Sequence, residues 1–171
     1  MDSKKNYRLA TDENGSPFVL NSKGSIDFGY ITEEMNLPPA PIRIAEGNES
    51  YGLAHIFKNH SVQLAECGFT DVLSFVEYVA MNFTSIKEGH NESYLLEVNS
   101  FRNHTLFVAL CKGSEYWKII SGGVFRLKYS RNKKKVYSVP AIRMPEPVSQ
   151  AKVPASGEIQ QDSTEASGDS L

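Results

Sequence analysis

The order of helical and extended patterns along this chain predicts an α+β fold, in which two helices pack on one face of an antiparallel sheet. Apolar residues recur with helical spacing in residues 70–82, and they alternate with polar residues in short segments after residue 83. The length of 171 residues suits one domain with flexible ends.

Residues 1–22 are interpreted as an N-terminal extension. A turn signal, Thr11-Asp12-Glu13-Asn14-Gly15, separates two short apolar pieces and predicts a small hairpin. Residues 23–31 contain another short extended piece. Three prolines within residues 37–41 exclude a helix there, and the alternation of Ile42 and Ile44 about an arginine predicts a half-buried strand.

Two helices are expected next. The first lies near Tyr51–His60, with Asn48 or Ser50 as its N-cap. The second lies near Thr70–Asn82, with Thr70 as the predicted N-cap. Its expected apolar face consists of Val72, Leu73, Phe75, Val76 and Val79.

After the helices the pattern favours a β-meander. The predicted strands are Ser85–Glu88, Tyr94–Val98, Thr105–Leu110 and Tyr116–Ile120. Ser121-Gly122-Gly123 is expected to interrupt the chain. Beyond it, Val124–Tyr129 and Val136–Val139 predict a last hairpin, with a helical turn over Val124–Ser130 as the alternative.

The remaining segment, residues 144–171, is rich in Pro, Ser, Glu, Gln and Ala and has no aromatic residue. Such a composition buries too little apolar surface to offset the entropy of ordering the chain. We expect a disordered tail or an interdomain linker.

Composition also indicates where the protein works. No apolar run approaches the roughly 18 residues of a membrane span, and no apolar stretch follows the polar N-terminus as in a signal peptide. A cytoplasmic protein without membrane contact is expected. Cys67 and Cys111 lie far apart without metal-ligand spacing, which favours free thiols.

Charge is unevenly distributed. Residues 99–143 contain ten Lys and Arg but a single acid, whereas residues 1–98 contain seven Lys and Arg and fourteen acids. A basic segment between acidic flanks predicts an anion-binding face. Lys134, at the tip of the expected hairpin, is a candidate substrate contact, although the Arg131–Lys135 run also suits a plain exposed turn. Three tyrosines could stack on bases, namely Tyr116, Tyr129 and Tyr137.

Two histidines in the first helix are candidates for acid–base catalysis, because histidine titrates nearest to neutrality. His55 and His60 are five residues apart, which places them about 140° apart around a helix axis. A zinc-protease pair would need a histidine at the position of Asn59, so a metal site built from this pair alone is not expected. His55 is the preferred catalytic residue, and His60 is expected at the helix end as a cap or orienting residue. His90 and His104 fall in predicted turns and are taken as incidental.

Downstream residues could stabilise a phosphodiester. Arg126 and Lys128 alternate with Phe125, Leu127 and Tyr129, so a strand would carry both cations on one face. Such cations suit the charge that grows in the transition state of phosphodiester cleavage, although ordinary solvent-facing charges explain the pattern equally. The Ser121-Gly122-Gly123 step is a candidate anion site or a strand-ending turn.

Five segments of the chain together carry a resemblance to a known family. They are Gly24–Gly29, Ala40–Gly47, Gly52–Ile56 with His60, Tyr94–Val98 and Tyr116–Gly122. These segments resemble a phage and prophage nuclease-like family of the barnase/EndoU/colicin/RelE-like superfamily, whose domains often belong to large polyvalent phage proteins or toxin-like effectors. The similarity covers about residues 23–140 and delimits a nuclease-like domain at 23–143.

The resemblance implies two N-terminal helices packed on a four-stranded antiparallel meander, and cleavage of RNA without a metal or another cofactor. The matching site positions are His55, Ser121 and either Arg126 or Lys128, with serine where the family more often has threonine. It also implies RNA as substrate, an immunity or antitoxin protein as a partner, and neighbouring domains.

The leading hypothesis is therefore an endoribonuclease that works by histidine-assisted transesterification. One alternative is a catalytically inactive phage module that binds nucleic acid or a protein through the basic hairpin. A phosphotransfer or ADP-ribose-handling enzyme is a third, disfavoured because the sequence has no nucleotide-binding fingerprint.

Overall fold

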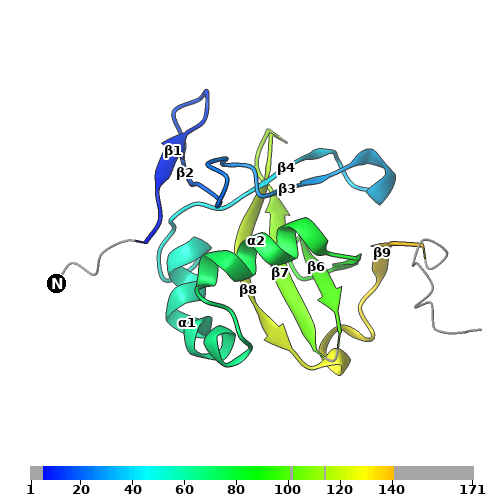
Figure 1. Cartoon of the computed structure of the whole chain (residues 1–171). Coiled ribbons are helices and arrows are strands. Elements are labelled where there is room, and N and C mark those ends of the chain that lie inside the picture. Colours follow the sequence, from blue (N-terminus) through cyan, green and yellow to red (C-terminus); the bar gives the residue numbers. More distant parts are fainter. Residues whose placement is uncertain (1–5, 101, 114, 141–171) are drawn as a thin grey trace, which may run out of the picture. The chain divides into compact units, whose positions relative to one another are not determined.

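The computed structural model describes residues 6–100, 102–113 and 115–140, and the predicted tail at 144–171 lies outside them. Two α-helices are flanked by strands on both sides along the chain (Figure 1). Before the helices come β1 (Leu9–Thr11), β2 (Pro17–Val19), β3 (Gly29–Ile31), the 3-10 helix η1 (Glu33–Met35) and β4 (Ala40–Arg43). The helices are α1 (Gly52–Glu66) and α2 (Val72–Asn82). After them come β5 (Ser85–Glu88), β6 (Ser93–Asn99), β7 (Asn103–Leu110), β8 (Trp117–Phe125), η2 (Leu127–Ser130) and β9 (Lys135–Ser138).

Seven strands form one curled mixed sheet in the order β3-β4-β8-β7-β6-β5-β9, and β1 pairs with β2 as the predicted separate hairpin. The pairing is antiparallel except between β4 and β8, which run parallel. The two edges of the sheet meet through η1, which follows β3 and contacts β9. There the side-chain amide of Asn36 donates a hydrogen bond to the carbonyl of Val136 at 3.0 Å.

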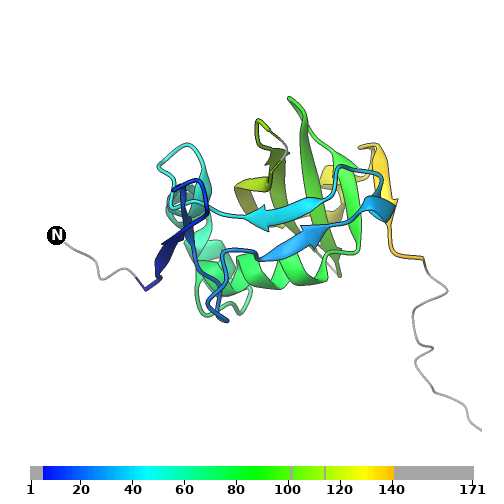
Figure 2. The ribbon, with the colours of Figure 1, turned by 90° about the horizontal axis from the view of Figure 1, so that it is seen from above.

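The apolar core fills the space inside this curl. Helix α2 contacts β3 as well as β6 and β7, and Figure 2 shows β3 running alongside it. A side chain at Gly29 of β3 would collide with the carbonyl oxygen of Ala80, so glycine is what lets the strand and helix approach. The largest fully buried side chains include Trp117, Phe28, Phe75, Ile56, Leu64, Ile86, Leu96 and Leu106.

Helix ends are defined by local hydrogen bonds. Asp71 caps α2, because its carboxylate accepts from the backbone N–H of Ser74 at 2.7 Å and a reciprocal bond completes a capping box. Thr70, the predicted N-cap, is therefore one residue too early. Helix α1 ends with a Schellman pattern in which Gly68 and Phe69 donate to the carbonyls of Ala65 and Leu64. It thus extends six residues beyond His60, where the sequence predicted its end.

The predicted α+β class is correct, but the predicted four-stranded meander on two N-terminal helices is wrong. Two strands that precede the helices, β3 and β4, join the same sheet, and β9 extends its other edge. These pairings are non-local, and the periodicity of one segment carries no information about a partner strand far away in sequence. The expected interruption at residues 121–123 is also wrong, since β8 runs through it.

The final predicted hairpin is wrong in the same region. Residues 127–130 form η2, which agrees with the alternative of a helical turn. Strand β9 pairs with β5 instead of with residues 124–129. Among the described residues, neither helix has the length and apolar character needed to cross a bilayer.

Candidate active site

The second half of β8 is bordered by a helix instead of a strand. Strand β4 pairs with β8 only at Trp117 and Lys118. Further along, the side-chain amide of Gln63 in α1 donates to the carbonyl of Val124 at 2.8 Å and accepts from its N–H at 3.1 Å. Gln63 thus replaces a neighbouring strand by one pair of hydrogen bonds, and it holds α1 beside the edge of β8.

A β-bulge in β8 determines where Ser121 points. Phe107 of β7 lies opposite Ser121, but the next residue, Val108, lies opposite Ile119, so Ile120 is the extra residue. Simple alternation from the buried Ile119 would place Ser121 in the core. The extra residue reverses the alternation, as bulges do. Ser121 therefore faces α1 on the side of the sheet away from α2.

Ser121 and His55 form a hydrogen-bonded pair. The Nε2 atom of His55 lies 3.1 Å from Oγ of Ser121, and Nδ1 lies 2.7 Å from the backbone carbonyl oxygen of Glu49. A carbonyl oxygen only accepts, so Nδ1 carries the proton. In the neutral ring Nε2 is then unprotonated and accepts from the hydroxyl of Ser121. The arrangement is a base within reach of a hydroxyl and oriented by a third group.

The loop between β4 and α1 brings the carbonyl of Glu49 to His55. Gly47 and Gly52 both have positive φ, and a Cβ at Gly47 would lie impossibly close to the backbone of Tyr51. The carboxylate of Glu49 accepts from Nζ of Lys58 at 2.7 Å, which joins the loop to the exposed side of α1. The loop therefore orients the ring of His55 through the carbonyl oxygen of Glu49.

His60 lies beside His55 and not at a helix end. The two rings are in edge contact, with centroids 6.5 Å apart, so the expected angular separation of about 140° does not keep them apart. The expected position at a helix end assumed that α1 ends near His60, whereas it continues to Glu66. Partial burial lowers the pKa of His60, and the nearby His55 lowers it further, while a hydrogen bond with Gln63 opposes them. His60 therefore loses its proton at a lower pH than an ordinary histidine does.

Gly123 leaves room for the ring of His60 against β8. A Cβ built on Gly123 would lie 3.0 Å from Nδ1 of His60 and 3.3 Å from Oε1 of Gln63. On the opposite side of the strand, a Cβ at Gly122 would lie 2.8 Å from Leu106 in the core. The glycine pair therefore permits close approach on both faces of β8 and is not a turn.

An aromatic row continues from the histidines. The rings of Phe125 and His60 are in edge contact, with centroids 6.3 Å apart. The ring of Tyr129 stacks on Phe125 with centroids 4.8 Å apart. Arg126 immediately follows Phe125 as the N-cap of η2, and Lys128 lies within η2, both exposed. They do not alternate along a strand, which corrects that expectation.

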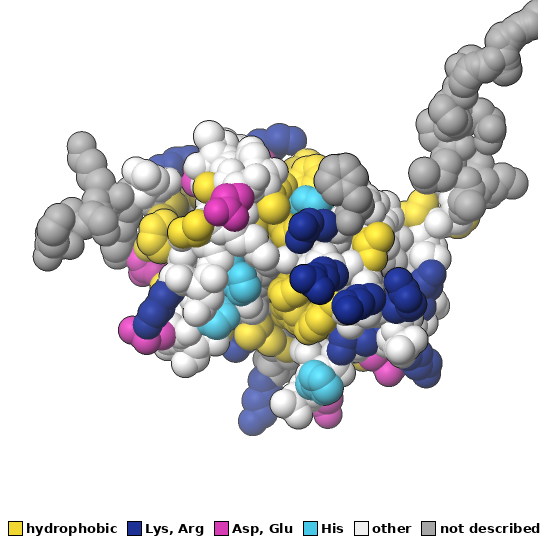
Figure 3. Space-filling view, turned by 90° about the horizontal axis from the view of Figure 1, so that it is seen from below, with side chains coloured by type: hydrophobic (Ala, Val, Ile, Leu, Met, Phe, Trp, Pro, Cys, Tyr) yellow, Lys and Arg dark blue, Asp and Glu magenta, His cyan; other side chains and the backbone are white. Residues whose placement is uncertain are grey.

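Figure 3 shows this face of the molecule. Two histidine side chains lie side by side, an apolar patch adjoins them, and a row of Lys and Arg side chains lies beyond the patch. The row of cations stands apart from the two histidines, with the apolar patch between them.

A buried ionic network holds η2 on the sheet. Glu97 is fully buried and forms an ion pair with Nζ of Lys87 at 3.3 Å. The same ammonium donates to the carbonyl and the hydroxyl of Ser130, each at 3.1 Å, and Asn103 donates to the hydroxyl at 2.9 Å. This network fixes the end of η2 and with it the position of Tyr129.

The other predicted site residues lie elsewhere. Tyr116 packs edge-on against Phe18 beneath the guanidinium of Arg43, and burial raises the pKa of its hydroxyl. Lys134 is exposed, 4.0 Å from the carboxylate of Glu88. Tyr137 is in the edge strand β9 and packs against the core.

Two further expectations concern the remaining histidines. His90 is exposed in a bend, as expected of a turn residue. His104 is in β7, where its ring contacts Phe69, Phe75 and Tyr78, so it is an aromatic packing residue and not part of a turn.

Three features of the site were missed from the sequence. The carbonyl of Glu49 has no side-chain signature. Asn59 donates to the carbonyl of His55 at 2.9 Å, and its position four residues after His55 was a usable signal. Gln63 comes three residues after His60 on the same helix face, which could have indicated a partner for that histidine.

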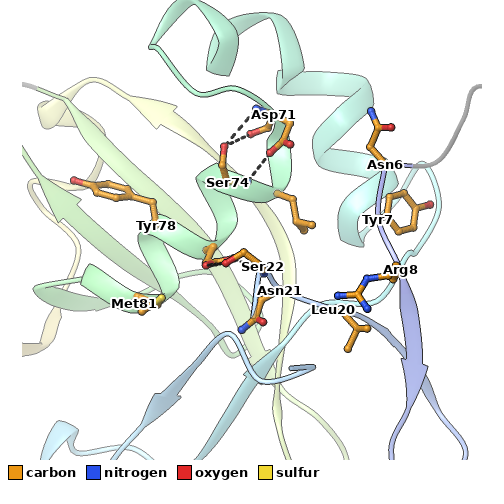
Figure 4. A pocket seen from close by; sticks show the side chains of 12 residues that line it. Asn6, Tyr7, Arg8, Leu20, Asn21, Ser22, Asp71, Ser74, Tyr78 and Met81 are labelled. Carbon is orange, nitrogen blue, oxygen red and sulfur yellow. Dashed lines mark hydrogen bonds between the residues drawn. The ribbon is translucent and has the colours of Figure 1, made fainter. Parts of the chain in front are cut away.

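A depression of about 650 Å³ lies beside α2, and no histidine lines it (Figure 4). Its polar groups bond to one another, as in the capping box of Asp71 and Ser74 and in the bond from Ser22 to Glu77. In the part of the chain that the structure describes, no three His, Cys, Asp or Glu side chains are grouped so that they could hold a metal ion.

Comparison with known proteins adds no relative. No protein-family model matches the chain, and a search of curated proteins finds no match.

Proposed function

We propose that the protein is an endoribonuclease that cleaves RNA without a metal ion, with His55 as the base. The observation that carries the proposal is the hydrogen bond between His55 and Ser121, with His55 oriented by the carbonyl of Glu49. The choice of RNA as substrate comes from the resemblance to nucleases, although the four-stranded sheet that the resemblance implies is not the sheet of this chain.

The chemistry follows from the protonation state of His55. Its unprotonated Nε2 removes the proton from a ribose 2′-hydroxyl, and the 2′-oxygen attacks the adjacent phosphorus. The bond from phosphorus to the 5′-oxygen breaks, and that oxygen takes a proton from water. The products are a 2′,3′-cyclic phosphate and a 5′-hydroxyl. His55 then returns its proton to solvent, and the carbonyl of Glu49 holds the ring throughout.

Other residues of this face have supporting roles. The hydroxyl of Ser121 is placed to donate to a phosphate oxygen when substrate replaces the bond to His55. His60 stays neutral in neutral solution because burial lowers its pKa. Arg126 and Lys128 would attract the RNA backbone from η2, and Tyr129 offers an exposed ring for stacking.

RNA in the cytoplasm is thus the proposed substrate. An immunity or antitoxin partner, and an origin in a polyvalent phage protein, belong to the same proposal and are independent of the chemistry. The chain could also act with its site inactive, as a module that binds nucleic acid through η2 and the basic turn after it.

The test is cleavage of single-stranded RNA in excess EDTA, with identification of the product ends. We expect 2′,3′-cyclic phosphate or 3′-phosphate ends. His55→Ala should lower the cleavage rate by about 10²-fold or more, the usual scale for loss of an acid–base group. His90→Ala is the matched control and should cleave like wild type. Absence of cleavage from pH 5 to pH 9, or full activity of His55→Ala, would refute the catalytic proposal and leave the binding module.

The same hydrogen bond supports a second candidate, a hydrolase with Ser121 as the nucleophile. The hydroxyl already faces an unprotonated nitrogen, as nucleophilic catalysis requires. Against it, Ser121 lies inside a strand and not on the exposed strand-to-helix turn of a nucleophile elbow. A fluorophosphonate probe distinguishes the two, since it labels an activated serine and should leave a ribonuclease unlabelled.

A further inference from the structure

A pocket of about 640 Å³ lies next to the histidine–serine pair. Its floor is the adjoining ends of β7 and β8, and its walls are the β1–β2 turn and Tyr51, the residue before α1. Ile120, the bulge residue that directly precedes Ser121, is one of its lining residues. The pocket therefore opens beside the place where the proposed reaction occurs, on the side of Ser121 away from η2. Its volume is in the range of small-ligand sites.

A cation and two aromatic rings occupy the walls of this pocket. Nζ of Lys118 lies 5.0 Å from the ring centroid of Tyr51. Lys118 and Ile120 are on one face of β8 by simple alternation. Because Ile120 is the extra residue of the bulge, Ser121 is on that face as well. Tyr116 supplies the second ring. No sequence argument had singled out Lys118 or Tyr51.

The walls are held in place before any ligand arrives. The side-chain amide of Asn14 donates to the carboxylate of Glu115 at 3.1 Å, which joins the β1–β2 turn to the β7–β8 turn. Asp12 accepts from the backbone N–H groups of Asn14 and Ser16, each at 2.9 Å, and its other oxygen faces Arg43 at 3.7 Å. Two segments far apart in sequence thus form a preorganised site.

We propose that this pocket binds the nucleotide on one side of the scissile phosphodiester, with its base stacked on Tyr51 and its phosphate paired with Lys118. The proposal rests on the proposed ribonuclease function and adds the subsite of that function. An aromatic ring is a sequence-tolerant platform for a base, and an ammonium beside it matches the phosphate that follows each base. Lys118 is then nearer in sequence to Ser121 than the cations Arg126 and Lys128 are.

Binding to the catalytically inactive His55→Ala protein tests this subsite. The probe is a fluorescent single-stranded RNA with 2′-O-methyl groups, which cannot be cleaved by transesterification, followed by anisotropy. We expect Tyr51→Ala and Lys118→Met, each placed in the His55→Ala protein, to weaken binding about tenfold, in line with the loss of one stacked base or one phosphate contact. Tyr51→Phe should bind normally because it keeps the ring. Lys134→Met removes the same charge from a remote exposed position and should change binding by less than about twofold.

The outcomes separate the subsite from the reaction. If wild type fails to cleave RNA but probe binding depends on Tyr51 and Lys118, the ribonuclease proposal fails and the nucleotide subsite stands. If wild type cleaves RNA while variants at both positions bind and cleave normally, the subsite is refuted and the ribonuclease stands. If no probe binds at all, the subsite is refuted. Thermal unfolding of each variant near the wild-type temperature excludes misfolding as the cause of weaker binding.

Discussion

The two faces of the seven-stranded sheet have different residues and different tasks. The face toward α2 is apolar and includes Leu106, Val108 and Ile119. The opposite face places Glu97, Thr105 and Gly123 in one row across three strands, with Ser121 in the next row. The first face supplies burial of apolar surface, whereas the second holds charge and hydroxyl groups in a fixed geometry next to the histidines.

Hydrogen-bond satisfaction shows how unusual the second face is. Oδ1 of Asn103 and Oγ1 of Thr105 are buried without a partner, and Thr105 lies opposite Gly123, against which His60 packs. Buried polar atoms are nearly always hydrogen-bonded in native proteins. The second face therefore differs from the first in carrying polar groups among its buried side chains.

The largest expected effect concerns the buried carboxylate. Glu97→Ala should lower the free energy of unfolding by about 3–5 kcal/mol, because Lys87 would remain buried with no counter-ion. Leu106→Ala on the apolar face should cost a similar amount, about 2–5 kcal/mol, through a cavity. Chemical denaturation measures both.

A double substitution sharpens this comparison. Replacing Lys87 and Glu97 together by leucine should recover much of the loss seen for Glu97→Ala, since no lone charge remains, whereas a second deletion in the apolar core should add to the first. Glu88→Ala, which removes only an exposed ion pair, is the control and should change stability by less than about 1 kcal/mol. A loss of less than about 1 kcal/mol for Glu97→Ala would contradict the role assigned to the network.

The glycine pair offers a smaller and more discriminating contrast. Gly122→Ala places a methyl group 2.8 Å from Leu106 and 3.2 Å from Phe75, so it should lower stability by about 1–3 kcal/mol. Gly123→Ala instead meets His60 and Gln63, so it should reduce cleavage more than it reduces stability. Unfolding curves and initial cleavage rates on the same preparations would test this. Equal loss of activity in both variants would contradict the assignment of different tasks to the two faces.

The pH dependence of stability provides a finer test. Burial lowers the pKa of His60 from its ordinary value of 6.5, so below that pH the unfolded chain binds more protons than the folded protein. Stability should be complete above about pH 6.5 and fall as the pH drops through the folded-state pKa. His60→Gln should show a smaller loss between pH 7.5 and pH 5 than wild type in denaturant unfolding. An unchanged loss would mean that His60 is not half-buried in solution.

The smallest effect is expected at the periphery. Lys134 is exposed and faces only Glu88, so Lys134→Ala should weaken RNA binding by less than about twofold and only at low salt. Titrations at two salt concentrations measure this. A tenfold loss would move the main nucleic-acid contact from the histidine face to the basic turn.

Local patterns predicted much of this protein because they report local physics. The turn at residues 11–15, the apolar face of α2 and the strands around Leu96 and Phe107 follow from turn chemistry and periodicity, and all are present. His55 was selected for its place on α1 beside an extended segment, and Ser121 for a resemblance. Their meeting at 3.1 Å is a contact that the sequence suggested but could not measure.

Residue types by themselves thus determined the α+β class, the helices and the basic segment, since each depends on neighbours a few residues away. Only the tertiary structure decided that β4 pairs in parallel with β8, that one bulge residue turns Ser121 out of the core, and that Lys118 lies over Tyr51. The reason is that strand partners and register are set by packing between segments far apart in sequence, and a shift of one residue exchanges the two faces of a strand. In this protein that one residue, Ile120, separates a core position from a candidate catalytic one.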